Sequence, residues 1–118
     1  MNKRALIRAY KETPRPMGIY RVHNTVADRS LVRQSVDLPS ALNRERTQLK
    51  FGGHPVKALQ ADWNALGPDA FVFEVLDTLT PDDAPGYDPS GDLAVLESMW
   101  LERLQPFAPA GYTPAPRR

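Results

Sequence analysis

The sequence predicts an α/β domain in which helices flank a small three-stranded antiparallel sheet. Three segments alternate apolar and polar residues with the period of two that is typical of strands: residues 17–22, 30–35 and 71–79. The mostly polar segment 23–29 predicts the loop of a β-hairpin between the first two. Apolar residues recur with helical spacing between the hairpin and the third strand, so we expect helices packed on the sheet. A chain of 118 residues fits one such domain.

The first strand has two different faces. Alternation places Ile19 on one face and Gly18, Tyr20 and Val22 on the other. We therefore expect one face to pack on the core while the other presents the phenol of Tyr20.

Two helices between the hairpin and the third strand have clear start and stop signals. The first follows Asp37, a typical N-cap residue, and ends at Gly52-Gly53. Its polar face carries Arg44, Arg46 and Lys50. The second opens at His54-Pro55 and ends before Gly67. Its apolar residues, spaced for one helix face, are Val56, Leu59, Trp63 and Leu66.

The ends of the chain differ in composition from its middle. We divide it into a basic N-terminal arm (residues 1–16), a domain (17–105) and a Pro-rich C-terminal tail (106–118). Within the domain, an irregular acidic loop at 80–92 precedes a last helix at 93–104. The chain has no Cys and no apolar run near the roughly 18 residues of a membrane span. We expect a cytoplasmic protein with no membrane partner.

Charge is divided along the chain. Residues 1–60 carry 12 Lys and Arg against 4 Asp and Glu, whereas residues 61–105 carry 1 against 10. The basic half has the charge of a surface that binds phosphate backbones. Alternatively, the two halves pair across the folded surface and cancel. Both alternatives stay open, because the order of charges along a chain does not say which faces meet.

Glu97 is a carboxylate among apolar residues. Its neighbours at helical spacing are Leu93, Trp100, Leu101 and Leu104. A charge in such a patch costs free energy unless a partner compensates it. The residues alone favour a structural Glu that is satisfied by an Arg or by backbone amides.

Several of these features together resemble the GIY-YIG nuclease domain, which occurs in phage homing endonucleases and in a bacterial excision-repair incision subunit. The resemblance rests on Gly18-Ile19-Tyr20, on the hairpin, and on the run from Asp37 through His54 to Glu97 and Trp100. It implies that Glu97 holds one divalent ion, Mg²⁺ or Mn²⁺, and that Tyr20 activates or positions the attacking water. It also implies a functional role for His54.

The chain departs from the pattern of this family at several positions. The second motif reads Leu31-Val32-Arg33, so a phenol is absent and a cation replaces a glycine. The family arginine falls on Ala41, and either Arg44 or Arg33 is a candidate to replace it. Near the end of the chain, the Gly-Tyr-Asn of the family pattern corresponds to Gly111-Tyr112-Thr113, so the amide side chain is absent.

The leading functional hypothesis is a metal-dependent nuclease that acts on DNA, structured or single-stranded, without a small-molecule cofactor. Tyr20, Arg44, His54 and Glu97 are its candidate catalytic residues. The candidate DNA-binding residues are Arg33, Arg44, Arg46 and Lys50. The opposing hypothesis is a catalytically impaired module that binds nucleic acid or has a regulatory role. A third hypothesis, a protein-interaction scaffold, rests only on the acidic loop at residues 81–92. The sequence predicts no oligomeric state.

Overall fold

The predicted three-stranded antiparallel sheet is present in the structure, a computed structural model that describes residues 15–115. Strands β1 (Met17–Asn24), β2 (Arg29–Ser35) and β3 (Phe71–Leu79) are ordered β2-β1-β3, so the first strand is central. In the hairpin, Tyr20 lies opposite Arg33 and Val22 opposite Leu31. The predicted basic arm lies outside the described residues except for its last two positions.

The hairpin loop is shorter than predicted, because both strands extend toward it. The side chain of Asn24 accepts hydrogen bonds of 3.0 Å from the backbone N–H groups of Val26 and Ala27. Asp28 adopts a positive φ of 53°, which short polar side chains tolerate best after glycine. These local contacts let β1 continue to Asn24 and β2 start at Arg29, where the sequence pattern alone predicted loop.

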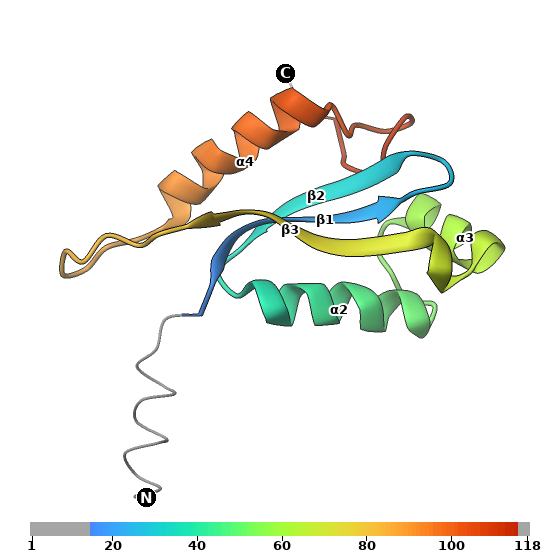
Figure 1. Cartoon of the computed structure of the whole chain (residues 1–118), viewed down its shortest axis with the longest axis horizontal. Helices are drawn as coiled ribbons and strands as arrows, with labels where there is room; N and C mark the ends of the chain where they lie inside the picture. Colours follow the sequence, from blue (N-terminus) through green and yellow to red (C-terminus); the bar gives the residue numbers. More distant parts are fainter. Residues whose placement is uncertain (1–14, 116–118) are drawn as a thin grey trace, which may run out of the picture.

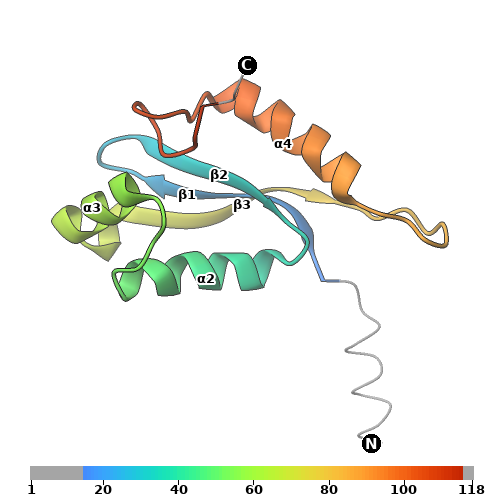
Figure 2. The ribbon, with the colours of Figure 1, turned by 180° about the vertical axis from the view of Figure 1, so that it is seen from behind.

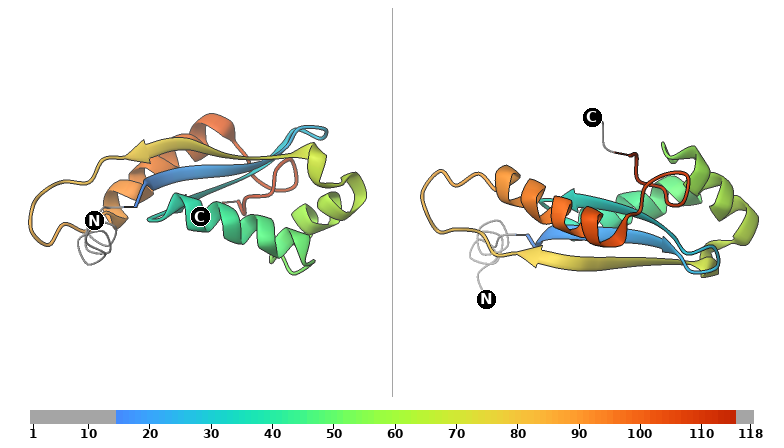
Figure 3. Two further views of the ribbon diagram at one scale, coloured as in Figure 1. Left: turned by 60° about the horizontal axis from the view of Figure 1, so that its bottom comes forward. Right: turned by 90° about the horizontal axis from the view of Figure 1, so that it is seen from above.

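Helices cover both faces of the sheet. Helix α2 (Leu38–Lys50) runs beneath it and α4 (Ser90–Leu104) lies above it (Figure 1). The view from behind shows the same two layers (Figure 2). Helix α3 (Lys57–Leu66) and the short 3-10 helix η1 (Pro68–Ala70) lie at the hairpin end of the molecule (Figure 3). Among the described residues, no helix is long and apolar enough to cross a membrane.

The helix boundaries agree with the predictions at α2 and differ at α3 and α4. Asp37 caps α2 as expected, since its side chain accepts a hydrogen bond from the N–H of Ser40. Helix α3 begins at Lys57 rather than at His54, because the His54 side chain is held by α2. Helix α4 begins at Ser90, so the acidic loop is shorter than predicted.

The main core lies between the α2 face of the sheet and helices α2 and α3. It contains Val22 of β1, Leu49 of α2 and Leu59 of α3, each at most 1% exposed. At the other end of α2, the ring of Tyr20 packs with Leu38 and Ala41. Burial of these side chains is the main source of stability, at roughly 25 cal/mol for each Å² of apolar surface removed from water.

The C-terminal tail is a packed part of the fold from Pro106 to Thr113. The N–H of Tyr112 donates to the carbonyl of Ser30 at 2.9 Å, and the N–H of Val32 donates to the hydroxyl of Thr113 at 3.0 Å. These bonds satisfy backbone groups on the outer edge of β2, which no other strand covers. Gly111 is required at its position, because a Cβ there would lie 2.2 Å from the carbonyl oxygen of Pro106.

Candidate functional site

Tyr20 projects from β1 toward α2, on the face that the sequence predicted. Leu38 and Ala41 pack against its ring, and the residue is 1% exposed. Its hydroxyl donates a hydrogen bond of 3.0 Å to Oε1 of Glu45. This face does present the phenol of Tyr20, as the sequence predicted, but it presents it to α2 rather than leaving it uncovered.

Glu45 lies on α2 one turn after Ala41 and is fully buried. Its Oε1 accepts a second hydrogen bond, of 2.9 Å, from Nη1 of Arg33. Its Oε2 lies 2.5 Å from Nε2 of His54. Burial by itself would raise the pKa of Glu45. The hydrogen bond from His54 and the charge of Arg33 outweigh burial, so the pKa lies below its ordinary value. We call Tyr20, Arg33, Glu45 and His54 the Glu45 network.

The backbone around His54 fixes the state of its ring. Nδ1 accepts a hydrogen bond of 3.0 Å from the N–H of Val56, so the ring proton is assigned to Nε2, which donates to Glu45. The N–H of His54 donates to Oε1 of Gln60, whose amide donates to the carbonyl of Leu49. This set of bonds holds the turn between α2 and α3 against the end of α2.

The environment of Tyr20 determines which proton transfers it can perform. Burial, the nearby charge of Glu45 and the hydrogen bond to Glu45 raise its pKa to about 12, although Arg33 acts in the opposite direction. At neutral pH the hydroxyl therefore stays protonated and donates to Glu45. A protonated hydroxyl that already donates to Glu45 is not a base for water, whereas the predicted role of Tyr20 in positioning water stays a prediction.

The predicted DNA-binding cations of α2 lie on its surface. Arg44 and Lys50 are exposed, and the guanidinium of Arg46 lies 4.6 Å from the centre of the Phe73 ring in β3. Arg44, a sequence candidate for the role of the family arginine at Ala41, is exposed, whereas Glu45, four residues after Ala41, lies on the same buried face as Ala41. Sequence reasoning missed Glu45, although Ala41, Glu45 and Leu49 place a carboxylate in an apolar stripe just as Leu93 and Glu97 do.

Glu97 lies on α4, on the opposite face of the sheet from α2 (Figures 1 and 2). It is half-buried, and it makes no hydrogen bond or ion pair with any residue between 15 and 115. Trp100, three residues later, donates its indole N–H to Asp77 of β3 at 3.0 Å. The structure therefore brings together Tyr20 and His54, but it joins neither Arg44 nor Glu97 to them.

The donor set around Glu97 limits what it could bind. Within the part of the chain that the structure describes, no group of three or more His, Cys, Asp or Glu side chains is placed to hold a metal ion. A single carboxylate suits a hard cation that takes its remaining ligands from water and a substrate phosphate. Glu97 fits that kind of site, but it does not fit a metal site whose ligands all come from the protein.

Comparison with solved structures identifies the fold. The catalytic domain of homing endonuclease I-TevI matches with a TM-score of 0.68 and 24% identity, over 85% of this chain and 99% of that domain. The chain has the GIY-YIG nuclease fold. A substituted form of the same domain, from intron endonuclease I-TevI, matches with a TM-score of 0.68 and 21% identity over 87% of this chain and 97% of its own. No protein-family model and no curated protein sequence matches the chain.

Within the GIY-YIG fold, the residues that depart from the family pattern have clear structural partners. Arg33 sits opposite Tyr20 in the hairpin, on the same face of the sheet, and its side chain reaches Glu45 of α2. Ala41 is buried and packs against the ring of Tyr20. Thr113 accepts the Val32 N–H on the edge of β2. The departures at residues 33, 41 and 113 are therefore accommodated by specific contacts in this chain.

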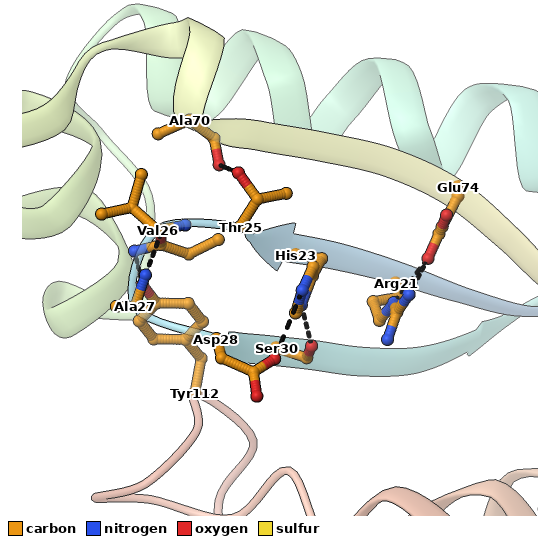
Figure 4. A network of polar contacts seen from close by, with 11 residues as sticks. Arg21, His23, Thr25, Val26, Ala27, Asp28, Ser30, Ala70, Glu74 and Tyr112 are labelled. Atoms are coloured by element: carbon orange, nitrogen blue, oxygen red, sulfur yellow. Dashed lines mark hydrogen bonds and ion pairs between the residues drawn. The ribbon is translucent and has the colours of Figure 1, made fainter.

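The face of the GIY-YIG sheet opposite the Glu45 network carries a second polar group (Figure 4). Nδ1 of His23 lies 2.6 Å from the hydroxyl of Ser30, and its Nε2 lies 3.4 Å from Asp28. These residue types also form hydrolase triads. Here the Asp28 side chain is 93% exposed in the hairpin turn and too distant for a good charge-assisted hydrogen bond, so it does not orient the ring as a triad carboxylate does. We interpret these contacts as support for the hairpin.

Proposed function

We propose that this chain is a nuclease that hydrolyses phosphodiester bonds of DNA, with Glu97 holding one Mg²⁺ or Mn²⁺ ion and Arg33 contacting a phosphate of the DNA backbone. Its fold is shared with the catalytic domain of an endonuclease over nearly the whole length of that domain, which supports this class of reaction. Glu97 keeps the role that the sequence suggested, and Arg33 is one of the two candidates that the sequence offered in place of the family arginine.

The observation that carries the proposal is the setting of Arg33. Its side chain is 35% exposed on the edge strand β2, and Nη1 is fixed by the buried carboxylate of Glu45. A guanidinium has five N–H donors in a rigid fork, so one contact to Glu45 leaves others for a phosphate. Arg33 thus combines a preset position with access from solvent, which suits a group that stabilises charge on a phosphate.

In this proposal Tyr20 and His54 are positioning residues. Both hold Glu45, and Glu45 holds Arg33. Arg44 and Lys50, exposed on α2, contact the phosphate backbone away from the reacting group. The bound metal ion would polarise the scissile phosphate, and Glu97 is a predicted site residue whose carboxylate has no partner among residues 15–115.

A second candidate function is a module that binds DNA without cleaving it. The observation that favours it is the closure of the Glu45 network: the Tyr20 hydroxyl is buried with a raised pKa, and Ala41 has replaced the family arginine. The same exposed cations on α2 would then bind backbone phosphates.

A cleavage assay distinguishes the two functions. Supercoiled plasmid and single-stranded DNA are incubated with Mg²⁺ or Mn²⁺ and the wild-type chain, Glu97→Ala or Arg33→Ala. Glu102→Ala is the matched control, because Glu102 is an exposed carboxylate on the same helix. We expect nicking by the wild type and by the control, and a loss on the order of 100-fold with either test variant.

The outcomes separate clearly. Nicking that survives Glu97→Ala would contradict the assignment of the metal ligand. Absence of nicking by the wild type, with DNA still retarded in a gel at low salt, would establish the binding module instead.

A further inference from the structure

Phe51 is the most exposed large apolar side chain in the described structure, at 81%. It follows the last residue of α2, and the chain then turns away through Gly52 and Gly53. A Cβ added at either glycine would meet no atom within 4 Å beyond its own chain neighbours, so the turn that follows Phe51 is not packed against the rest of the molecule. An aromatic ring in this position exposes apolar surface to water at a cost in free energy.

The fold does not need this ring to end the helix. The N–H groups of Phe51, Gly52 and Gly53 donate to the last carbonyls of α2, at 3.0, 3.2 and 2.9 Å respectively. Gly52 takes the positive φ of 78° that a helix C-terminus commonly requires. The backbone therefore completes the cap, and the Phe51 side chain contributes little burial to it.

The segment of chain that carries Phe51 is cationic. Between residues 38 and 60 the only acidic side chain is Glu45, which is fully buried. The exposed cations of this segment include Arg44, Lys50 and Lys57. Arg44 precedes Phe51 by seven residues, so the two share one side of α2, about 10 Å apart along its axis. Proteins bind single-stranded nucleic acid with the same two kinds of group: aromatic rings stack on the bases, and cations contact the phosphate backbone.

We propose that Phe51 stacks on an unpaired base of a single-stranded or locally unpaired nucleic acid, while Arg44, Lys50 and Lys57 contact its backbone. This inference rests on the proposed function and names the substrate class of the same protein. A fully paired duplex stacks its bases on one another and offers no free base face to a side ring. Phe51 thus selects unpaired segments, whereas the cations bind any phosphate backbone.

Fluorescence anisotropy with a labelled oligonucleotide, as a single strand and as the blunt duplex of the same sequence, tests the proposal at low salt. The proteins are the wild-type chain, Phe51→Ala, Phe51→Leu and Phe51→Trp. Val95→Ala is the control, because Val95 is an apolar residue of α4 that is 62% exposed. We expect Phe51→Ala and Phe51→Leu to lose roughly 5- to 150-fold in affinity for the single strand and less than about twofold for the duplex.

Phe51→Trp should keep the affinity for the single strand, because it retains a stacking surface, and Val95→Ala should bind as the wild type does. Equal binding of the single strand by the wild type and Phe51→Ala would overturn the inference while leaving the proposed function intact. An equal loss for single strand and duplex would also overturn it. Absence of binding to either DNA by the wild type would overturn both the inference and the proposed function.

Discussion

At the scale of single residues, the unusual feature is a fully buried carboxylate. Glu45 is tolerated because three donors, from β1, β2 and the turn before α3, converge on its two oxygens. Burying a charge costs several kcal/mol, and good geometry with satisfied hydrogen bonds is needed to offset that cost. Removing Glu45 therefore leaves the polar groups that contact it without a hydrogen-bond partner in the protein interior.

Replacement of Glu45 should therefore be strongly destabilising. We expect Glu45→Ala to lower the free energy of unfolding by about 3–5 kcal/mol, because Arg33 and the polar groups of Tyr20 and His54 lose their acceptor. Glu45→Gln should cost less, about 1–3 kcal/mol, since its amide oxygen still accepts while its NH₂ group opposes the N–H of His54. Urea denaturation checks both values, with the exposed Glu102→Gln as a control that should change stability little.

The pH dependence gives an independent test of the same residue. The folded pKa of Glu45 lies below its ordinary value of 4.5, so the unfolded chain binds this proton more readily. Its contribution to stability is complete above the ordinary pKa and is lost as pH falls through the folded value. Glu45→Gln should flatten this acid limb of the stability profile. An unchanged acid limb would show that Glu45 does not carry the expected charge.

At the scale of elements, the C-terminal segment closes the outer edge of the sheet. Tyr112 pairs with the backbone of β2, and its hydroxyl donates to Asp62 of α3 at 2.5 Å. Arg29 of β2 bonds the same carboxylate at 2.7 Å. This tail thus ties the edge strand to α3, and the fold extends beyond the domain boundary that the composition suggested at residue 105.

A single hydroxyl tests the importance of this edge contact. Thr113→Val keeps the shape of the side chain but removes the acceptor of the Val32 N–H, so we expect a loss of about 1–3 kcal/mol in the free energy of unfolding. Thr113→Ser retains the oxygen and should lose clearly less. Thermal unfolding of the two variants checks this, and equal losses would show that the hydroxyl contact contributes nothing.

At the scale of the whole molecule, only some charges of the basic half of the sequence form ion pairs with the acidic half. Arg21 pairs with Glu74 and Arg29 with Asp62, which joins the basic half to the acidic half. By contrast, no ion pair involves Arg44, Lys50 or Lys57 anywhere in residues 15–115. Cancellation therefore occurs across the sheet, and unpaired cations remain on the surface of α2 and at the start of α3.

This distribution predicts how salt acts on DNA binding. Affinity should fall linearly with the logarithm of salt concentration, because each contacted phosphate releases counterions. Lys50→Gln should reduce the magnitude of that slope for single-stranded DNA by about 0.7, whereas Arg103→Gln on α4 should leave it unchanged. Binding titrations over a range of salt concentrations measure both slopes. An equal effect of the two variants would contradict a binding surface on α2.

Much of the fold could be predicted from local patterns. Alternation identified the three strands, and helical spacing with Asp37 and the paired glycines identified α2. The hairpin loop and the start of α3 were predicted less well, since side chains decided them: Asn24 extends β1, and the bond from His54 to Glu45 delays α3. The face of Tyr20 was also predictable, but its burial was not, because α2 covers it.

The sequence by itself determined the order and type of the elements, because the period of apolar residues is a local property of the chain. It also marked Glu97 as a carboxylate in an apolar setting. Only the tertiary structure decided that Glu45 is the buried centre of the predicted site. Its partners Tyr20, Arg33 and His54 are separated from it by 25, 12 and 9 residues, and they meet only when hairpin, helix and turn pack together. Burial and pKa depend on that packing, because they are set by everything that surrounds a group rather than by its neighbours in the chain.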